Sequence, residues 1–192
     1  ADIRQVAHIM GLDERIGDKF LNPGPGIGGS CFPKDTKALH HIANQAGVPL
    51  RILESTIEAN NLRKLAMAKR ILAAVPANAT IGVLGITFKQ NTDDIRESPA
   101  LIICEELLEA GASLRIYDPK GMDAGKQHFG ESDNIHWCED SYDAAGGVDA
   151  LTILTEWNSF RSLNLAELKA AMKTHTILDL RNICDPAEMK RA

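Results

Sequence analysis

The sequence lacks the patterns that mark several common classes of protein. None of its apolar runs approaches the roughly 20 residues that span a bilayer, and no signal-peptide pattern opens it, so we expect no membrane partner. The formal net charge of -5 and the pI near 5.7 argue against nucleic acid as a partner. The six histidines show no HxxxH or HExxH spacing, so we predict no metal site.

Cysteine is scarce and shows no paired spacing. The four cysteines are widely separated and form no CxxC pair: Cys31, Cys104, Cys138 and Cys184. This pattern fits a reducing cytosol better than a disulfide framework. We therefore expect a cytoplasmic protein.

The rest of the composition is that of an ordinary globular protein. The chain has 192 residues, 44% of them hydrophobic and 24% charged, which is enough for one to two domains. Apolar residues recur at helical spacing in residues 1–76, whereas residues 77–192 alternate strands with helices, with the boundary at Pro76–Asn78. The sequence predicts an α/β protein, in which a helical segment is followed by a doubly wound, Rossmann-like parallel-sheet domain.

Expected elements follow from the same periodicity. In the first domain the helices are Asp2–Met10, Pro33–Ala46 and a long one from about Leu50 to Val75. The elements expected in the second domain are, in order, strand Thr80–Ile86, helix Ser98–Ala110, strands Ala112–Tyr117, Ile135–Trp137 and Val148–Leu154, helix Asn164–Met172 and strand Thr176–Leu180. Parallel sheets bind ligands at the carboxyl ends of their strands, so we expect a site there.

A glycine-rich loop that runs into a helix is the most informative stretch. Gly26–Asp35 contains three glycines, then Cys31, then Pro33 in a position that suits the first turn of a helix. A thiol at a helix start lies at the positive end of the helix dipole and beside Lys34, which favours the nucleophilic thiolate, and the Asp35 carboxylate lies one turn on. These residues predict a site of covalent catalysis. A structural cysteine, packed as a small hydrophobe, remains the alternative.

Five sequence blocks resemble the signatures of one enzyme family. They occur in the same order over most of the chain: GGSCFPKDTKAL (28–39), Gly85–Pro99, Tyr117–Pro119, Thr155–Phe160 and Asp179–Asn182. The family is that of the nucleotide-sugar 6-dehydrogenases, which includes the UDP-glucose and GDP-mannose branches. The amino-acid sequences of the first and fourth blocks are more similar to the UDP-glucose branch.

The resemblance implies a reaction and its catalytic residues. Members oxidise the C6 alcohol of UDP-glucose to a carboxylate in two NAD-dependent hydride transfers. Cys31 corresponds to the nucleophile that forms a thiohemiacetal and then a thioester, and Asp35 to the carboxylate that positions or activates water. Lys34 and Arg96 correspond to contacts with NAD.

The resemblance also implies the substrate-binding residues. Those along the nucleotide-sugar moiety are Phe20, Leu21, Asn22, Pro23, Gly24, Gly28 and Phe88. Lys89 and Arg181 correspond to contacts with phosphate or sugar, which charge-assisted hydrogen bonds favour. Arg15 corresponds to a residue that reaches the substrate of a neighbouring subunit, and the long helix to a homodimer interface.

Structural alternatives stay open for these residues. Residues 20–28 could be a plain connecting loop, and Phe88 a core residue. The charged side chains that could instead be solvated are Arg15, Asp35, Lys89 and Arg181. Arg96 could form a structural ion pair with Asp93 or Asp94.

One motif that a nicotinamide dehydrogenase needs does not precede the cysteine loop. That motif is a strand–GxGxxG–helix fingerprint for the dinucleotide. Together with the resemblance, we interpret the chain as the C-terminal part of a longer enzyme whose NAD-binding domain and upstream catalytic Lys, Asn and Glu are missing here. We expect the chain alone to bind nucleotide weakly, if at all, and not to turn over.

Other functions remain as alternatives. A GDP-mannose 6-dehydrogenase shares the GGSC and PKD core, whereas enzymes acting on UDP-N-acetyl-hexosamines typically carry His in place of Ser30. A non-catalytic nucleotide-binding or dimerisation module fits the missing NAD domain but not an intact Cys31 and Asp35. A thiol hydrolase or acyltransferase needs a histidine base near Cys31, and His40 and His41 lie on the far part of the same helix.

Overall fold

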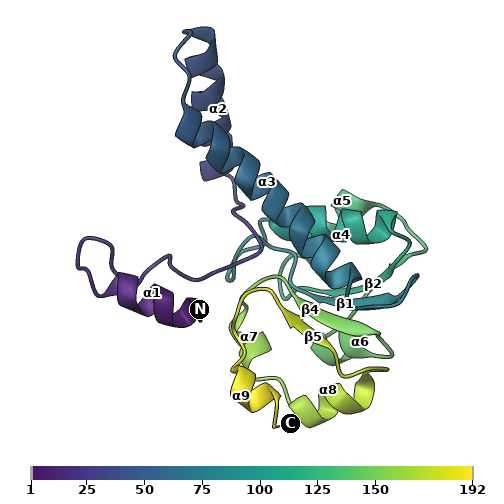
Figure 1. The fold of residues 1–192 in the computed structure, drawn as a ribbon. Coiled ribbons are helices and arrows are strands. Elements are labelled where there is room, and N and C mark those ends of the chain that lie inside the picture. Colours follow the sequence, from purple (N-terminus) through teal and green to yellow (C-terminus); the bar gives the residue numbers. More distant parts are fainter. Residues whose placement is uncertain (1, 192) are drawn as a thin grey trace.

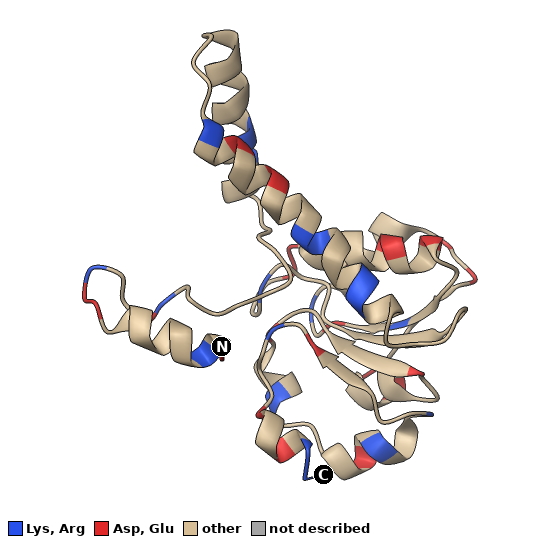
Figure 2. Ribbon diagram, in the orientation of Figure 1, with Lys and Arg blue, Asp and Glu red and all other residues tan. Residues whose placement is uncertain are grey.

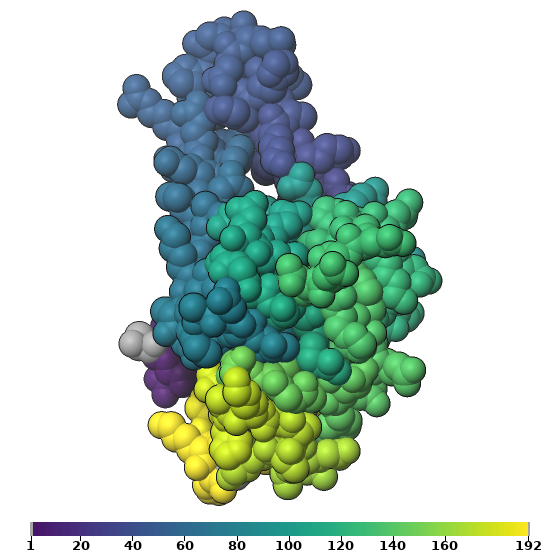
Figure 3. Space-filling model, turned by 90° about the vertical axis from the view of Figure 1, so that its right-hand side faces the viewer, coloured from purple at the N-terminus to yellow at the C-terminus, as the bar shows by residue number. Residues whose placement is uncertain are grey.

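The computed structural model describes residues 2–191 and has two parts. Helices α1 (Ile3–Gly11), α2 (Phe32–Gln45) and α3 (Arg51–Leu72) make up the first part, and a sheet with its covering helices makes up the second. Figures 1 and 3 show α2 and α3 as a hairpin that stands out from the sheet body. Among residues 2–191, none of the helices combines the length and apolar character that crossing a membrane requires.

Local sequence accounts for the helices of the first part. Asp2 caps α1, because its carboxylate accepts a hydrogen bond from the Arg4 N–H at 2.9 Å. Pro33 lies in the first turn of α2, where its missing N–H costs nothing. In α3 the acidic side chains lie in the first half and most basic ones in the second (Figure 2), an order that the helix dipole favours. All three expected helices are present, with ends shifted by one to three residues.

Five parallel strands form the sheet, in the order β3–β2–β1–β4–β5. The strands are β1 (Thr80–Leu84), β2 (Ser113–Tyr117), β3 (Ile135–Trp137), β4 (Ala150–Ile153) and β5 (Ile177–Asp179). The chain winds outward from β1 in one direction and then crosses to β4 and winds in the other. The predicted doubly wound α/β fold is therefore confirmed, and its switch point lies between the carboxyl ends of β1 and β4.

The sheet separates two apolar clusters. On one face α4 (Pro99–Glu109) packs against the sheet and against the second half of α3, and Ile71 and Ile103 are fully buried between them. On the other face α6 (Ser141–Ala145) and α8 (Leu165–Ala171) enclose Phe160, which is 2% exposed. The core thus lies in the sheet body and extends along only the last turns of α3.

The structure differs from the sequence expectation in detail. Strand β1 ends at Leu84 rather than Ile86, because Gly85 turns the chain at φ +90° and the Ile86 N–H donates to Asp118. Four short helices were not expected, namely α5 (Met122–Phe129), α6, α7 (Asn158–Arg161) and α9 (Pro186–Met189). Each is too short for a helical period to show clearly in the sequence.

A buried carboxylate joins the strand ends at the carboxyl edge of the sheet. Asp118 is 1% exposed, and its Oδ2 accepts hydrogen bonds from the Ile86 N–H (2.7 Å) and from the Thr87 N–H and Oγ1 (3.0 Å each). Trp157 Nε1, after β4, lies 3.3 Å from the same oxygen. The other carboxylate oxygen of Asp118, Oδ1, accepts a hydrogen bond from the Gly121 N–H in the turn after β2 (2.8 Å).

We predict that removal of this carboxylate strongly destabilises the fold. Asp118→Ala leaves several buried donors without an acceptor, so the free energy of unfolding should fall by about 3 kcal/mol or more. Urea denaturation followed by circular dichroism measures the change. Asp133→Asn, at an exposed aspartate, is the matched control, and a loss for Asp118→Ala as small as the control's would contradict the prediction.

A second buried aspartate makes stability depend on pH. Asp149 pairs with Lys173 at 2.7 Å and accepts from the Thr80 N–H at 2.9 Å, and these contacts hold the pKa of the carboxyl below its ordinary value. Because the pKa of this carboxyl is lower in the folded than in the unfolded protein, its ionised form stabilises the fold at pH values above the unfolded-state pKa. This stabilisation is lost as the pH falls through the folded-state pKa. Asp149→Asn should therefore cost about 1–2 kcal/mol at pH 7. The difference from wild type should shrink below about pH 4 in urea titrations, and a pH-independent difference would refute this origin.

Candidate active site

The glycine loop before Cys31 is held against the sheet body. A Cβ on Gly28 would lie 2.6 Å from the Glu97 carbonyl oxygen, and one on Gly29 (φ +96°) would lie 2.8 Å from the Phe88 ring. The Gly29 N–H donates to the Arg96 carbonyl at 3.0 Å. Larger residues would push the loop away, which explains why this stretch is built from glycine.

Helix α3 holds the same loop from the other side. Asn60 Oδ1 accepts a hydrogen bond from the Ile27 N–H at 2.7 Å, and Asn60 Nδ2 donates to the Ile27 carbonyl at 3.2 Å. A Cβ on Gly26 would lie 3.1 Å from both Asn60 Oδ1 and Lys64 Cγ. The loop therefore lies between α3 and the segment that leads into α4.

Cys31 is the residue before the first turn of α2, and it is exposed. Its Sγ lies 3.8 Å from Ser30 Oγ. The Asp35 N–H donates to the Cys31 carbonyl at 2.9 Å, so Asp35 lies one helical turn on, as expected. Lys34 Nζ pairs with Asp35 Oδ1 at 3.0 Å, and both side chains are mostly exposed. The thiol and a carboxylate thus share one accessible helix start.

Arg96 contacts Asp94 through Nε (2.9 Å) and Nη2 (2.7 Å), and this contact is the main cause that raises the pKa of Arg96. Cys31 makes a smaller contribution to the same shift. The ion pair with Asp94 that the sequence left open is therefore present. The side chain of Arg96 is still 71% exposed, so it can also meet a ligand.

A cavity of about 700 Å³ opens beside the carboxyl edge of the sheet. Its volume is in the range of small-molecule sites. Basic side chains outnumber acidic ones in its wall, which suits an anionic ligand. The lining residues are Arg4, Ala7, His8, Asp18, Lys19, Phe20, Leu21, Asn22, Pro23, Glu156, Arg161, Arg181 and Asn182.

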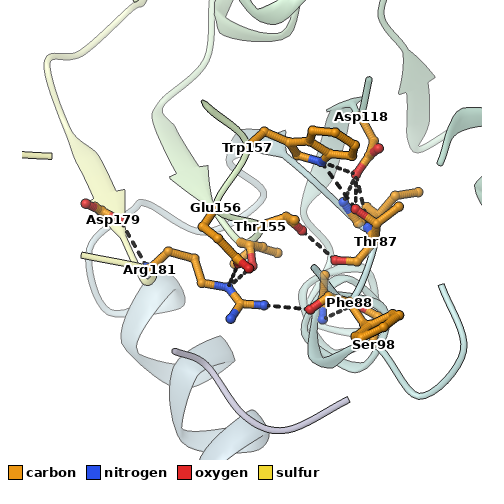
Figure 4. Close-up of polar contacts among 12 residues, drawn as sticks. Thr87, Phe88, Ser98, Asp118, Thr155, Glu156, Trp157, Asp179 and Arg181 are labelled. Atoms are coloured by element: carbon orange, nitrogen blue, oxygen red, sulfur yellow. Dashed lines mark hydrogen bonds and ion pairs between the residues drawn. The ribbon is translucent and has the colours of Figure 1, made fainter. Parts of the chain in front are cut away.

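The Arg181 side chain is fixed in this wall by hydrogen bonds to the backbone carbonyls of other residues. Its Nε donates to the Leu154 carbonyl at 2.7 Å and its Nη2 to the Phe88 carbonyl at 3.1 Å (Figure 4). Glu156 Oε2 lies 3.1 Å from Nε, and this ion pair opposes the lowering of the Arg181 pKa by burial. Nη1 makes no hydrogen bond with the described residues and faces Gly24, where a Cβ would lie 2.7 Å away.

The structure brings some of the predicted residues together and leaves others apart. Phe20 to Pro23 line the cavity with Arg181, and Gly24 contacts the Arg181 guanidinium. Lys89 does not line it; it is exposed, with its Nζ 5.3 Å from the centroid of the half-buried Phe88 ring. Arg15 is 89% exposed and paired with Asp13 at 2.6 Å. The proposed roles of these residues stay predictions.

Three residues that the sequence analysis did not select lie at these sites. Asn60 and Lys64 follow Ile57 on the buried face of α3, and polar residues at core-facing spacing are a signal that could have found them. Lys64 is 2% exposed, and burial lowers its pKa while Glu97 opposes that shift. Arg161 follows the Thr155–Phe160 block by one residue and lines the cavity.

Three potential metal ligands come together elsewhere. His136, Cys138 and Asp143 each bring one donor atom to within 4.8 Å of the others. The Asp143 carboxylate is already paired with Arg115 and accepts from the Glu139 N–H, and burial raises the pKa of Cys138 to about 12. We interpret the group as a structural network, and the absence of a metal site stays a prediction.

Two family models match the chain over most of its length. Residues 82–186 match the UDP binding domain of the UDP-glucose/GDP-mannose dehydrogenase family, and residues 1–62 match the central domain of the same family.

Named relatives and solved structures agree. A UDP-glucose 6-dehydrogenase from Rhizobium meliloti is 47% identical over 95% of this chain and 42% of its own length, and TuaD, a UDP-glucose 6-dehydrogenase from Bacillus subtilis, is 40% identical over 100% and 42%. The structure of a UDP-glucose dehydrogenase from Pyrobaculum islandicum superposes with a TM-score of 0.81 at 31% identity, over 93% of this chain and 40% of that one. The chain thus spans about two fifths of these relatives. It belongs to the UDP-glucose/GDP-mannose dehydrogenase family.

Proposed function

We propose that this chain is the part of an NAD-dependent UDP-glucose 6-dehydrogenase that carries the catalytic thiol and the UDP-sugar-binding sheet. The observation that carries the proposal is the position of Phe88, whose ring packs on the Cys31 loop and whose carbonyl holds Arg181 at the cavity. One residue thus connects a nucleophile with an anion site. The relatives named UDP-glucose 6-dehydrogenase support this choice of reaction.

Cys31 is the proposed nucleophile. An aldehyde cannot become a carboxylate by loss of hydride alone, so the thiol first adds to the aldehyde carbon, and its proton ends on the aldehyde oxygen. Loss of hydride from the carbon, together with loss of the hydroxyl proton to water, converts this thiohemiacetal into a thioester. Water then breaks the C–S bond and releases the carboxylate and the thiol. Asp35, one helical turn away and exposed, is the proposed group that positions or activates this water.

The diphosphate of the substrate is proposed to bind at the carboxyl edge of the sheet. Arg181 Nη1 is the group best prepared for it, since the other guanidinium nitrogens are already fixed by Leu154, Phe88 and Glu156. Residues 20–24 are proposed to lie along the nucleotide and sugar, with Gly28 and Phe88 beside the reacting carbon. Lys89 and the neighbouring subunit's counterpart of Arg15 are proposed as further cationic contacts, which their exposure allows.

NAD, when bound, supplies the hydride acceptor for both oxidation steps. Lys34 and Arg96 are the proposed contacts of this chain with it, because both are exposed cations beside Cys31. We propose that the main NAD-binding surface lies outside this chain, which spans only 42% of the first relatives. A cytoplasmic location is part of the proposal, supported by four free cysteines.

The competing functions have weaker support. The GDP-mannose dehydrogenase of Pseudomonas aeruginosa superposes with a TM-score of 0.72 but at 26% identity, below the 47% of the Rhizobium enzyme. A thiol hydrolase needs a histidine base at Cys31, and among the described contacts His40 Nε2 instead lies 3.0 Å from Asn44 Nδ2 on the same helix. A purely non-catalytic module does not explain an exposed thiol with a carboxylate one turn away.

Homodimer formation through the first part of the chain is also proposed. Among the described residues, every large apolar side chain that is strongly exposed lies between Ile3 and Leu62, and the sheet body has none. Exposed apolar residues gathered on one part of a protein mark an interaction surface. A second copy of the chain covering the projecting helices accounts for this distribution.

Binding of UDP compounds is the first expected outcome. Calorimetric titration with UDP-glucose, UDP and GDP-mannose should show weak binding of the two uridine compounds. Their dissociation constants should be lower than that of GDP-mannose by about tenfold or more. Arg181→Ala should abolish this binding, because the change removes the guanidinium nitrogen Nη1 that is proposed to bind the diphosphate. Arg181→Lys should recover little, since an ammonium cannot replace the fork of N–H donors.

Arg63→Ala is the matched control for this titration, because Arg63 is exposed on α3 and lies outside the cavity. Equal affinity for GDP-mannose and UDP-glucose would contradict the UDP-sugar assignment. Undiminished binding by a folded Arg181→Ala variant would contradict the assigned phosphate site. Formation of NADH from UDP-glucose by this chain alone would contradict the location of the main NAD surface outside it.

Light scattering tests the dimer. The chain should have twice its mass of 20.9 kDa, and Ile52→Asp should convert it to a monomer, because this change places a charge on a side chain that is 87% exposed on α3. Gln127→Glu adds the same charge to an exposed position of the sheet body and should leave the dimer intact. A monomeric wild-type chain, or an intact Ile52→Asp dimer, would rule out this interface.

A further inference from the structure

We infer that Asn60 is a positioning residue for Cys31, an inference that rests on the proposed role of Cys31 as nucleophile. Asn60 lies in the middle of α3, 33 residues from the loop that it contacts. Asn60 does not line the cavity at Arg181, and the contacts of the described residues include no hydrogen bond between it and the Cys31 thiol. Its action is therefore through the backbone of the loop.

The two hydrogen bonds of Asn60 fix the orientation of one peptide segment. A loop with no regular structure must find partners for its backbone N–H and C=O groups elsewhere. Asn60 supplies an acceptor to the Ile27 N–H at 2.7 Å and a donor to the Ile27 carbonyl at 3.2 Å. An uncharged amide is one of the few side chains that offers both at once.

A second attachment lies two residues further along the loop. The Gly29 N–H donates to the Arg96 carbonyl at 3.0 Å, on the side of the sheet body. Cys31 follows two residues later. The loop that carries the thiol is thus attached on two opposite sides. Of these two attachments among the described residues, only the one at Asn60 is made by a side chain.

Anchoring of α3 itself does not depend on Asn60. The helix is attached to the sheet body through Met67, Ala68 and Ile71, all 6% exposed or less and about two to three turns further along. Asn60 is only half-buried. Its loss should release the loop while the two apolar clusters stay intact.

A substrate-directed alkylation experiment on this chain measures the position of the thiol. The probe is UDP carrying an iodoacetamide group on its terminal phosphate, and free iodoacetamide is the reference reagent. The Cys31 thiolate attacks the CH₂ carbon, a C–S bond forms and iodide leaves, while the thiol proton passes to the buffer. The reaction is specific, because burial raises the pKa values of Cys104, Cys138 and Cys184 to about 12.

Asn60→Ala should slow alkylation by the tethered probe about tenfold or more, since a small displacement of a reacting atom removes the advantage of proximity. The rate with free iodoacetamide should change less than about twofold, because Cys31 is already exposed. Asn60→Asp keeps an acceptor for the Ile27 N–H and loses the donor, so it should give an intermediate rate. Hydrogen exchange at the Ile27 amide should rise in the same order.

Asn61→Ala is the matched control, because Asn61 is exposed, adjacent and of the same type. A tethered rate in Asn60→Ala equal to wild type overturns the inference. Equal slowing with both reagents and a lower melting temperature, in Asn60→Ala and Asn60→Asp alike, means a general structural role and also overturns it.

The wild-type chain tests the proposed function separately. If it reacts no faster with the tethered probe than with iodoacetamide, or if excess UDP does not suppress the difference, the nucleotide site proposed beside Cys31 is wrong and the role of Asn60 is lost with it. If wild type shows the acceleration and Asn60→Ala shows the same acceleration, only the role of Asn60 is lost.

Discussion

The hydrogen bonds of the buried Asp118 carboxylate are the constraint on which the rest of the sheet edge depends. One oxygen accepts from the backbone of Ile86 and Thr87 just after β1, and Trp157 after β4 approaches it, while the other oxygen accepts from the turn after β2. A carboxylate out of contact with water is stable only when such donors surround it. The ends of three strands are therefore fixed by one side chain.

This constraint extends to the cavity at Arg181 and to the cysteine loop. Thr87 is fixed by Asp118 and by Thr155, whose Oγ1 donates to the Thr87 carbonyl at 2.6 Å. The next residue is Phe88, whose carbonyl accepts from Arg181 and whose ring meets Gly29. The segment Thr87–Phe88 thus determines both the orientation of the Arg181 guanidinium and the path of the glycine loop.

The two parts of the chain differ in how far they bury their own apolar side chains. The sheet body encloses its own apolar clusters, whereas α1 has no buried residue and the hairpin of α2 and α3 exposes Leu39, Ile42 and Ile52. An apolar helix face in water is unfavourable, and the homodimer proposed above would cover this one. The glycine loop lies where the two parts meet, which leaves the Cys31 thiol exposed at their junction rather than inside the sheet body.

Much of this could be predicted from the sequence, because it depends on neighbouring residues. The period of apolar residues predicted the three helices of the first part and the parallel strands, and Pro33 and Ser98 marked helix starts. The one-turn spacing of Cys31 and Asp35 is likewise local. Tertiary structure decided the rest, because it depends on residues far apart in the chain: the pairing of Asn60 with Ile27, the burial of Lys64, and the direction of Arg181 Nη1 toward Gly24. A sequence pattern shows which face of a helix is polar, but only packing determines which backbone that face meets.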